Sequence, residues 1–353
     1  MQTDFQRSDK AVANWLFFGV FLLIVQILLG GITRLSGSGL SITEWEVVTG
    51  TLPPLSQSQW LTEFDKYKTT PQYKLLNSDF TLSDFKFIFF WEWIHRFWAR
   101  MMGLVFAVGF VYFLVKRYFR REMVRPLVVL FLLGGLQGAV GWIMVASGLV
   151  GDAVYVKPTR LALHFILAIG LLSYTFWFAL QLSVPAKYIT AHKGLQRFTL
   201  LLLLLLVVQL LFGALMAGHK AATVAPTWPL INDTWLPDTW LKESPLLLNF
   251  IENKLTIHFV HRNLAFVFSV LLLGWYFFAA KVQAPLVQAT RFLPVVLVGL
   301  QAALGILSVL LSLQIIPNRW GVYEWLAQLH QLGGMCLLLS LVWFLYLVRP
   351  SQR

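Results

Sequence analysis

Long runs of apolar residues recur along the chain, and polar or mixed segments separate them. A helix needs about 20 mostly apolar residues to cross a bilayer. Eight runs are of this kind, and they lie near residues 14–32, 86–115, 126–146, 159–181, 196–217, 256–279, 290–312 and 325–348. The first run continues past the usual length of the apolar region of a signal peptide and meets no small-residue cleavage pattern. The pattern therefore predicts an all-α, polytopic membrane protein with eight transmembrane helices.

The charge of the connections between these runs predicts their orientation. Three short connections carry many basic residues and a single acid, and they comprise residues 116–125, 182–195 and 280–289. The positive-inside rule places these connections and both termini in the cytoplasm. The long connections 33–85 and 218–255 then face outward. Their many tryptophans and prolines predict packed structure at the membrane interface.

The composition agrees with a membrane protein, since 58% of the residues are hydrophobic and 12% are charged. A soluble domain carries roughly 25% charged residues, so an ordinary globular enzyme is excluded. The formal net charge of +12 reflects orientation in a lipid bilayer, and no nucleic-acid partner is expected. The single cysteine, Cys336, excludes a disulfide framework and a thiolate metal site within the chain. The chain also lacks Cys-x-x-Cys-His, which excludes covalently attached c-type haem.

Four short motifs occur twice, in the same order along the chain. Residues 25–31 match 208–214, His95-Arg96 matches His261-Arg262, residues 135–141 match 299–305, and His164 matches His330. Because each half holds four spans, both halves have the same orientation, as in a parallel repeat about an axis near the membrane normal. We predict two four-helix bundles, an N-terminal half at residues 1–185 and a C-terminal half at 186–353.

Four histidines lie on the even-numbered spans, at about one to three turns from the outer end of each helix. They are His95, His164, His261 and His330. Two histidines per half, on different helices at matching depth, suit axial ligation of a haem iron from opposite faces. The alternative for each one is a hydrogen bond between helices. Zinc fits less well, because no acidic or thiolate partner is duplicated with the histidines.

Two arginines directly follow a candidate ligand, Arg96 after His95 and Arg262 after His261. A guanidinium at this position can bind the carboxylates of haem propionates through charge-assisted hydrogen bonds. The alternative is that the side chain extends toward the lipid headgroups.

The two halves differ in their remaining charged residues. The spacing that pairs His95 with His261 pairs Glu92 with His258, and it pairs Arg100 and Arg160 with apolar residues. Glu92 and His95 share a helix face, and a carboxylate in an apolar site suits proton transfer. The alternative is that Glu92 is only an ion-pair partner of the arginine four residues later. This difference predicts that the first half hosts the reaction and the second carries electrons.

Several motifs, in order, resemble the haem A synthase family over nearly the whole chain. They comprise residues 30–35, 38–41, Trp45, 50–54, 85–100, 137–149, 160–164, 217–218, 227–229, 249–253 and 259–262. The resemblance implies conversion of haem O to haem A for cytochrome oxidase, with a haem methyl group oxidised to a formyl group through a hydroxymethyl intermediate. It implies substrate ligands His95 and His164, haem b ligands His261 and His330, and a carboxylate needed for activity, Glu92. We assign Arg96, Arg100 and Arg160 to the substrate and Arg262 to the cofactor.

The chain resembles the branch of the family that lacks paired cysteines in its outer loops, as in Gram-negative bacteria and mitochondria. Without an Arg-rich, Ser-rich leader, the expected location is the bacterial inner membrane. His258 stands where the family pattern leads us to expect glutamine. A haem O synthase and an electron-transfer protein are candidate partners, and a homo-oligomer stays an open alternative. Two other functions also stay open at this point, a di-haem b electron carrier and a transporter built from parallel repeats.

Overall fold

The computed structural model describes residues 2–44, 49–314 and 320–350. Within these residues, eight helical segments are long and apolar enough to cross a membrane, as the sequence predicts. They are α1 (Gln2–Leu35), α4 (Leu82–Val115), α5 (Arg121–Ala146), α6 (Pro158–Ser183), α7 (Lys193–His219), α8 (Lys254–Ala279), α9 (Pro285–Thr290) with α10 (Leu293–Leu310), and α11 (Val322–Leu347). Shorter elements in the connections are η1 (Thr49–Thr51), α2 (Gln57–Lys68), α3 (Pro71–Leu76), η2 (Ala186–Tyr188), η3 (Ala221–Val224), η4 (Leu246–Phe250) and η5 (Ser312–Gln314).

Several helices extend beyond their predicted limits, and in two spans the structure shows a local reason for the difference. Helix α4 starts four residues before the predicted run because the side chain of Thr81 accepts the N–H of Asp84, which caps the helix there. His95 therefore lies more than three turns from the start of its helix, deeper than expected. The predicted span 290–312 is instead the short helix α9 followed by α10. Pro294, at the start of α10, has no N–H to continue the preceding helix.

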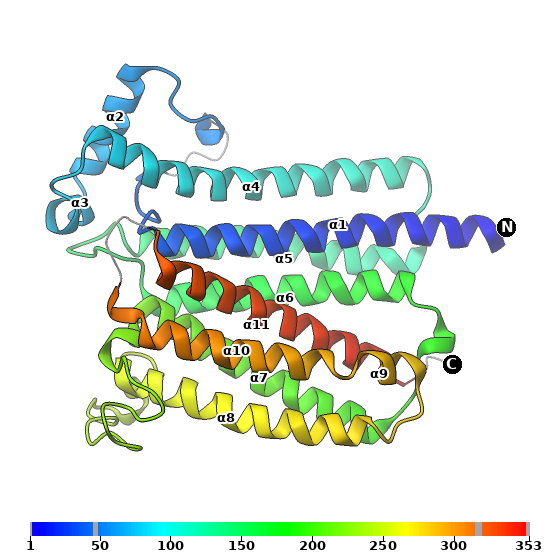
Figure 1. Ribbon diagram of the computed structural model, residues 1–353. Helices are drawn as coiled ribbons and strands as arrows, with labels where there is room; N and C mark the ends of the chain where they lie inside the picture. The colour runs from blue at the N-terminus through cyan, green and yellow to red at the C-terminus, as the bar shows by residue number, and fades with distance from the viewer. Residues whose placement is uncertain (1, 45–48, 315–319, 351–353) are drawn as a thin grey trace.

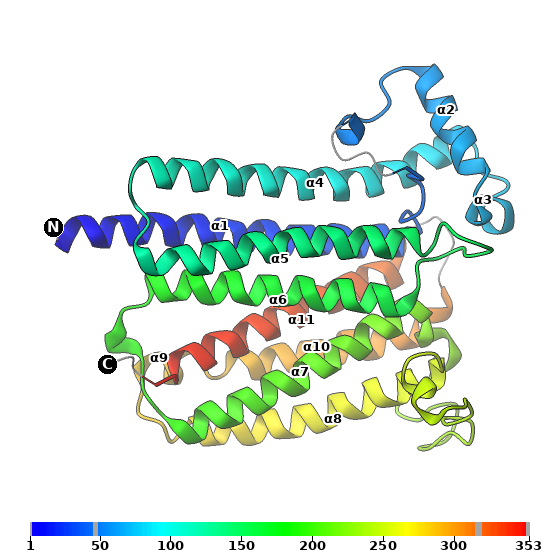
Figure 2. The same cartoon turned by 180° about the vertical axis from the view of Figure 1, so that it is seen from behind.

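The central helices are α1, α6, α7 and α11. Helix α1 packs on α4 and α6, and α5 packs on α6 (Figure 1). Helix α7 packs on α8 and α11, and α10 packs on α11 (Figure 2). Contacts of α6 with α7 and of α1 with α11 join the first four spans to the last four. The boundary at residues 185 and 186 and the parallel repeat stay predictions.

Both termini lie at one end of the bundle, and α2 and α3 lie at the other end (Figure 1). The outer segment around α2 and α3 has its own small core, in which Phe64, Tyr67 and Phe85 stack on one another. This confirms the packed structure that its aromatic composition predicts. The assignment of the two ends to the cytoplasm and the outside stays a prediction.

Polar side chains join α11 to α1 inside the bundle. Nε2 of Gln328 donates to the carbonyl oxygen of Leu28 at 3.0 Å, and Nε2 of Gln331 donates to that of Ile27 at 2.8 Å. Both glutamine side chains lie against Gly31, where the absence of a Cβ lets the helices approach closely. These bonds fix α11, which carries His330, against α1.

Candidate functional site

The two histidines of the first half pack in the same way against glycines of neighbouring helices. The Cε1 edge of His95 on α4 lies against Gly30 of α1, and that of His164 on α6 lies against Gly141 of α5. A Cβ added to Gly30 or Gly141 would lie 3.1 or 2.8 Å from the respective Cε1 atom. Carbon atoms in contact are normally about 3.5–4.0 Å apart. Glycine therefore provides the room that each ring occupies.

The second half repeats this packing. The Cε1 edge of His261 on α8 lies against Gly213 of α7, and that of His330 on α11 lies against Gly305 of α10. Here an added Cβ would lie 3.2 and 3.0 Å from Cε1. All four predicted ligands thus share one mode of packing, each against a neighbouring odd-numbered span.

A glutamine precedes each of these glycines by one helical turn. Nε2 of Gln26, Gln137 and Gln209 donates to the backbone carbonyl oxygen of the facing histidine, at 3.2, 3.1 and 3.0 Å respectively. In the fourth case the backbone carbonyl of Gln301 lies 3.1 Å from Nδ1 of His330. The rings of His95 and His261 also bond to the backbones of Gln26 and Gln209. The Oε1 atoms of all four glutamines are buried, and none has a hydrogen-bond partner among the described residues.

The histidines of the second half face each other with the spacing of paired axial ligands. The ring centroids of His261 and His330 are 6.4 Å apart, and the ring planes cross at 76°. A metal held by two imidazole nitrogens at about 2 Å, with each centroid about 1 Å further out, separates the centroids by about 6 Å. The donor set therefore fits a haem iron, which takes one axial ligand from each face.

The first half also brings its histidines together. His95 and His164 are close enough for their rings to interact electrostatically. Across the described parts of the chain, no three His, Cys, Asp or Glu side chains gather as a metal-ligand cluster. Each half thus offers a two-ligand set, the number that axial ligation of haem uses.

Glu92 is 2% exposed, and both of its carboxylate oxygens have partners. Oε2 accepts the hydroxyl of Ser41 at 2.7 Å and the backbone N–H of Ile42 at 2.9 Å. Oε1 lies 2.5 Å from Nη2 of Arg96. The ion pair that the i,i+4 spacing indicates is therefore present, and the first outer loop closes over the acid.

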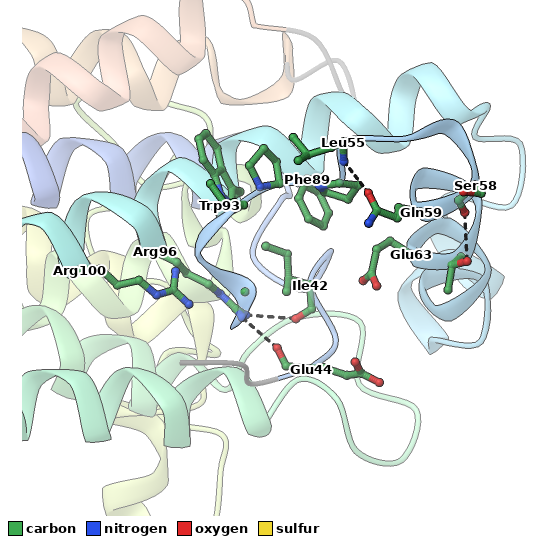
Figure 3. Close-up of a pocket in the computed structure, with 15 residues that line it drawn as sticks. Ile42, Glu44, Leu55, Ser58, Gln59, Glu63, Phe89, Trp93, Arg96 and Arg100 are labelled. Carbon is green, nitrogen blue, oxygen red and sulfur yellow. Dashed lines mark hydrogen bonds between the residues drawn. The ribbon is translucent and has the colours of Figure 1, made fainter. Parts of the chain in front are cut away.

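Arg96 holds the first outer loop to α4 as well as pairing with the acid. Its guanidinium donates to the carbonyl oxygens of Ile42 at 3.1 Å and Glu44 at 3.3 Å. Figure 3 shows Arg96 and Arg100 on the same side of α4, along a cavity of about 440 Å³ between this helix and the loop. Arg160 does not line this cavity and donates to a backbone carbonyl at the end of α5. The structure thus groups two of the three substrate-assigned arginines.

Arg262 holds the second outer loop in a similar way. It is 9% exposed and donates to the carbonyl oxygens of Thr227 at 2.8 Å, Leu230 at 2.9 Å and Pro229 at 3.3 Å. Its Nη2 is also 3.0 Å from Nε2 of His258. The guanidinium is therefore turned to the loop rather than extended to the headgroups.

The residue four positions before each of these two arginines differs between the halves. It is Glu92 on α4 and His258 on α8, and each side chain contacts its arginine. His258 is 1% exposed. Both pairs connect a helix to its outer loop, but the first half alone has a carboxylate at this position.

The glutamine and glycine partners of the histidines were not among the predicted site residues. Their signal is a Gln-x-x-x-Gly pattern at residues 26–30, 137–141, 209–213 and 301–305. In the sequence this pattern marks the repeat, but spacing alone does not tell which helix faces which histidine. Trp45, which belongs to the predicted first-loop motif, lies outside the described residues.

Comparison with known proteins decides the family. The model of a family described as cytochrome oxidase assembly protein, COX15-CtaA, matches residues 13–342. The chain belongs to this family. The match reaches from α1 to α11, so it includes all four histidines and Glu92.

Relatives within the COX15-CtaA family are similar over almost their whole length. The heme A synthase of Rhodospirillum centenum is 42% identical over 357 residues, which cover 98% of this chain and 91% of that protein. The heme A synthase of Flavobacterium psychrophilum is 38% identical over 346 residues, covering 96% and 98%. That of Bradyrhizobium diazoefficiens is 43% identical over 304 residues, covering 85% and 84%.

Proposed function

We propose that this protein oxidises a methyl group of haem O to a formyl group, through a hydroxymethyl intermediate, and so supplies haem A for cytochrome oxidase. The family match and the relatives named heme A synthase support this reaction. One observation carries this proposal. The two histidine pairs pack in the same way against glycines of neighbouring helices, and a buried carboxylate lies beside the first pair. An enzyme with a resident haem and a substrate haem requires this kind of asymmetry.

In this proposal each half binds one haem. His95 and His164 ligate the substrate haem O, and His261 and His330 ligate the haem b cofactor. The iron of bound haem supplies the redox chemistry, whereas the protein orients the groups and excludes water. Arginines on the ligand helices are proposed to bind the propionates, and they are Arg96, Arg100 and Arg160 for haem O and Arg262 for haem b.

Glu92 is proposed as the catalytic carboxylate, which holds or accepts a proton near the methyl edge of the substrate. Ser41, Ile42 and Arg96 fix its two oxygens, so the carboxylate cannot turn freely. Its counterpart His258 has no carboxylate chemistry, which supports placing the reaction in the first half. A haem b held by His261 and His330 would supply electron transfer between the substrate haem and a partner protein.

The proposed location is the bacterial inner membrane, with eight spans and both termini in the cytoplasm. The common end of the two termini supports a shared side, and the basic short connections support the cytoplasmic assignment (Figure 1). Haem O is poorly soluble in water, so direct transfer from a haem O synthase is proposed.

The test is co-expression with a haem O synthase, followed by purification, haem extraction and mass analysis. We expect haem B together with haem A or its hydroxymethyl precursor. Glu92→Gln should leave haem bound and stop formyl formation, because the amide cannot accept the proton. Haem B alone, despite a supply of haem O, would favour a di-haem b electron carrier. A purified protein without a Soret band would exclude both functions.

A further inference from the structure

Three of the four ligand histidines lie in what we call an imidazole slot, the space beside a Gln-x-x-x-Gly turn on the neighbouring helix. The slots are formed by Gln26 and Gly30, Gln137 and Gly141, and Gln209 and Gly213. Axial ligation needs the histidines, but it does not by itself require a carboxamide beside each of these rings. The repeated pairing therefore needs its own explanation.

The carboxamide of each slot lies at nearly the same distance from both nitrogens of the imidazole. Nε2 of Gln209 is 3.2 Å from Nδ1 and 3.4 Å from Nε2 of His261. The distances are 3.2 and 3.4 Å for Gln26, and 3.2 and 3.2 Å for Gln137. A donor on the lone pair of one ring nitrogen would lie clearly closer to that atom. Nearly equal distances instead show that the amide contacts the ring without bonding to one nitrogen alone.

The carboxamide is itself held in place. Its Nε2 also donates to the backbone carbonyl of the same histidine, at 3.0 Å for Gln209 and His261. Gly213, one turn further along α7, lies against the Cε1 edge of the same ring and leaves no free space there. Contact with the carboxamide and with the glycine opposes rotation of the imidazole about its Cβ–Cγ bond, a torsion that is otherwise broad for histidine.

In the fourth site, the side chain of the glutamine does not lie beside the facing histidine. The side chain of Gln301 is turned toward Gly333 of α11, where a Cβ would collide with its Oε1 atom. His330 is oriented by the bond between its Nδ1 and the backbone carbonyl of Gln301, at 3.1 Å. His95 and His261 also bond to the backbone of their glutamine, so only the carboxamide contact distinguishes their slots from the fourth site. A ring N–H donated to a carbonyl is the usual way in which proteins orient a metal-binding histidine. Gln301 is therefore a glutamine in the equivalent sequence position without a side-chain contact to the ring.

We propose that Gln26, Gln137 and Gln209 are positioning residues that fix the plane of the facing imidazole before haem binds. The proposal rests on the proposed ligation of haem by the four histidines. An imidazole that is already oriented loses less rotational freedom on binding, which raises the affinity for haem. The planes of the two axial imidazoles also determine the electronic structure of a low-spin ferric haem, so a released ring has a spectroscopic consequence.

The test compares Gln209→Leu with Gln301→Leu in the purified holoprotein, because both substitutions are in the second half and concern the resident haem. Low-temperature electron paramagnetic resonance of the ferric protein measures the g values, and titration with haem measures the affinity. Gln209→Leu should shift or broaden the low-spin signal and lower the haem affinity roughly 10-fold. Gln301→Leu should leave both unchanged. In Gln209→Met the new side chain has the same length but no N–H group. This variant should show the same shift of the low-spin signal, with an unchanged thermal midpoint.

Two results would overturn the proposal. One is a parental signal in both Gln209→Leu and Gln209→Met. The other is an equal shift in the Gln209 and Gln301 variants, since that would report a general change in packing. His261→Ala separates this outcome from failure of the haem site itself. If every low-spin signal survives His261→Ala, the haem assignment fails; if that variant loses the signal and Gln209→Leu keeps it, the positioning role alone fails.

Discussion

Replacing Gly141 with alanine tests whether His164 must lie against α5. The added Cβ would lie 2.8 Å from Cε1 of the ring, which is about 0.7 Å inside a normal carbon contact of about 3.5 Å. The methyl group is fixed to the helix backbone and cannot move away by itself. Either the imidazole is displaced by about this distance, or α5 and α6 separate.

The expected loss in activity at Gly141 follows from this displacement. A misplacement of about 1 Å near a reacting group can cost on the order of 100-fold in rate. About 0.7 Å at the ligand His164 should therefore lower haem A formation roughly 10-fold. Overpacking costs about 1–3 kcal/mol, and the higher helix propensity of alanine offsets up to about 1 kcal/mol. The protein should still fold.

Gly135→Ala is the matched control, because this glycine is on the same helix and an added Cβ meets nothing within 4 Å. Both variants are co-expressed with a haem O synthase, and the extracted haems are quantified per folded protein. We expect reduced haem A for Gly141→Ala and an unchanged amount for Gly135→Ala. Parental haem A in both variants, or an equal loss in both, would refute the proposed packing of His164 as a requirement for the reaction.

Three further perturbations have expected outcomes. Ser41→Ala removes one donor to Glu92, at 2.7 Å, and should lower haem A formation less than Glu92→Gln; an equal loss would contradict this. Burial raises the pKa of the Tyr67 hydroxyl to about 12 in the folded protein. The unfolded chain, in which a tyrosine has a pKa of about 10, therefore loses this proton at a lower pH, and the free energy of unfolding falls as the pH rises from about 10. Tyr67→Phe should flatten that part of the thermal-midpoint profile, and an unchanged slope would argue against it. Gln331→Leu removes the bond to Ile27, at 2.8 Å, and should cost about 0.6 kcal/mol, measured as a lower thermal midpoint; an unchanged midpoint would show that the bond contributes nothing.

The spans could be predicted because a bilayer requires a long apolar run, which is visible without tertiary structure. Their ends depend on local polar chemistry instead. The capping of α4 by Thr81 and Asp84 is readable in retrospect from the sequence pattern. The break before α10 has a similar local cause in Pro294. Neither the cap nor the proline is part of the pattern of long apolar runs, so a search for such runs does not detect these helix ends.

In the candidate site, too, some residues could be predicted from the sequence and others could not. The four histidines are recognisable because they are repeated and rare within spans. The role of Gln209 depends on α7 lying beside α8, which the spacing of residues does not determine. The bonds of Arg96 and Arg262 to loop carbonyls depend on loop conformations without any periodicity. The sequence therefore indicates the candidate ligands but not the groups that orient them.

The comparison of Glu92 with His258 separates a structural role from a chemical one. A buried carboxylate needs a charged or hydrogen-bonding partner, so Arg96 could be present only to compensate for Glu92. Arg262 argues against this, since it makes the same kind of bonds to loop carbonyls opposite an imidazole. Holding the outer loop is thus independent of the acid. Because the second half folds without a carboxylate at this position, the fold alone does not explain Glu92, which supports the proposed role of this acid in the reaction.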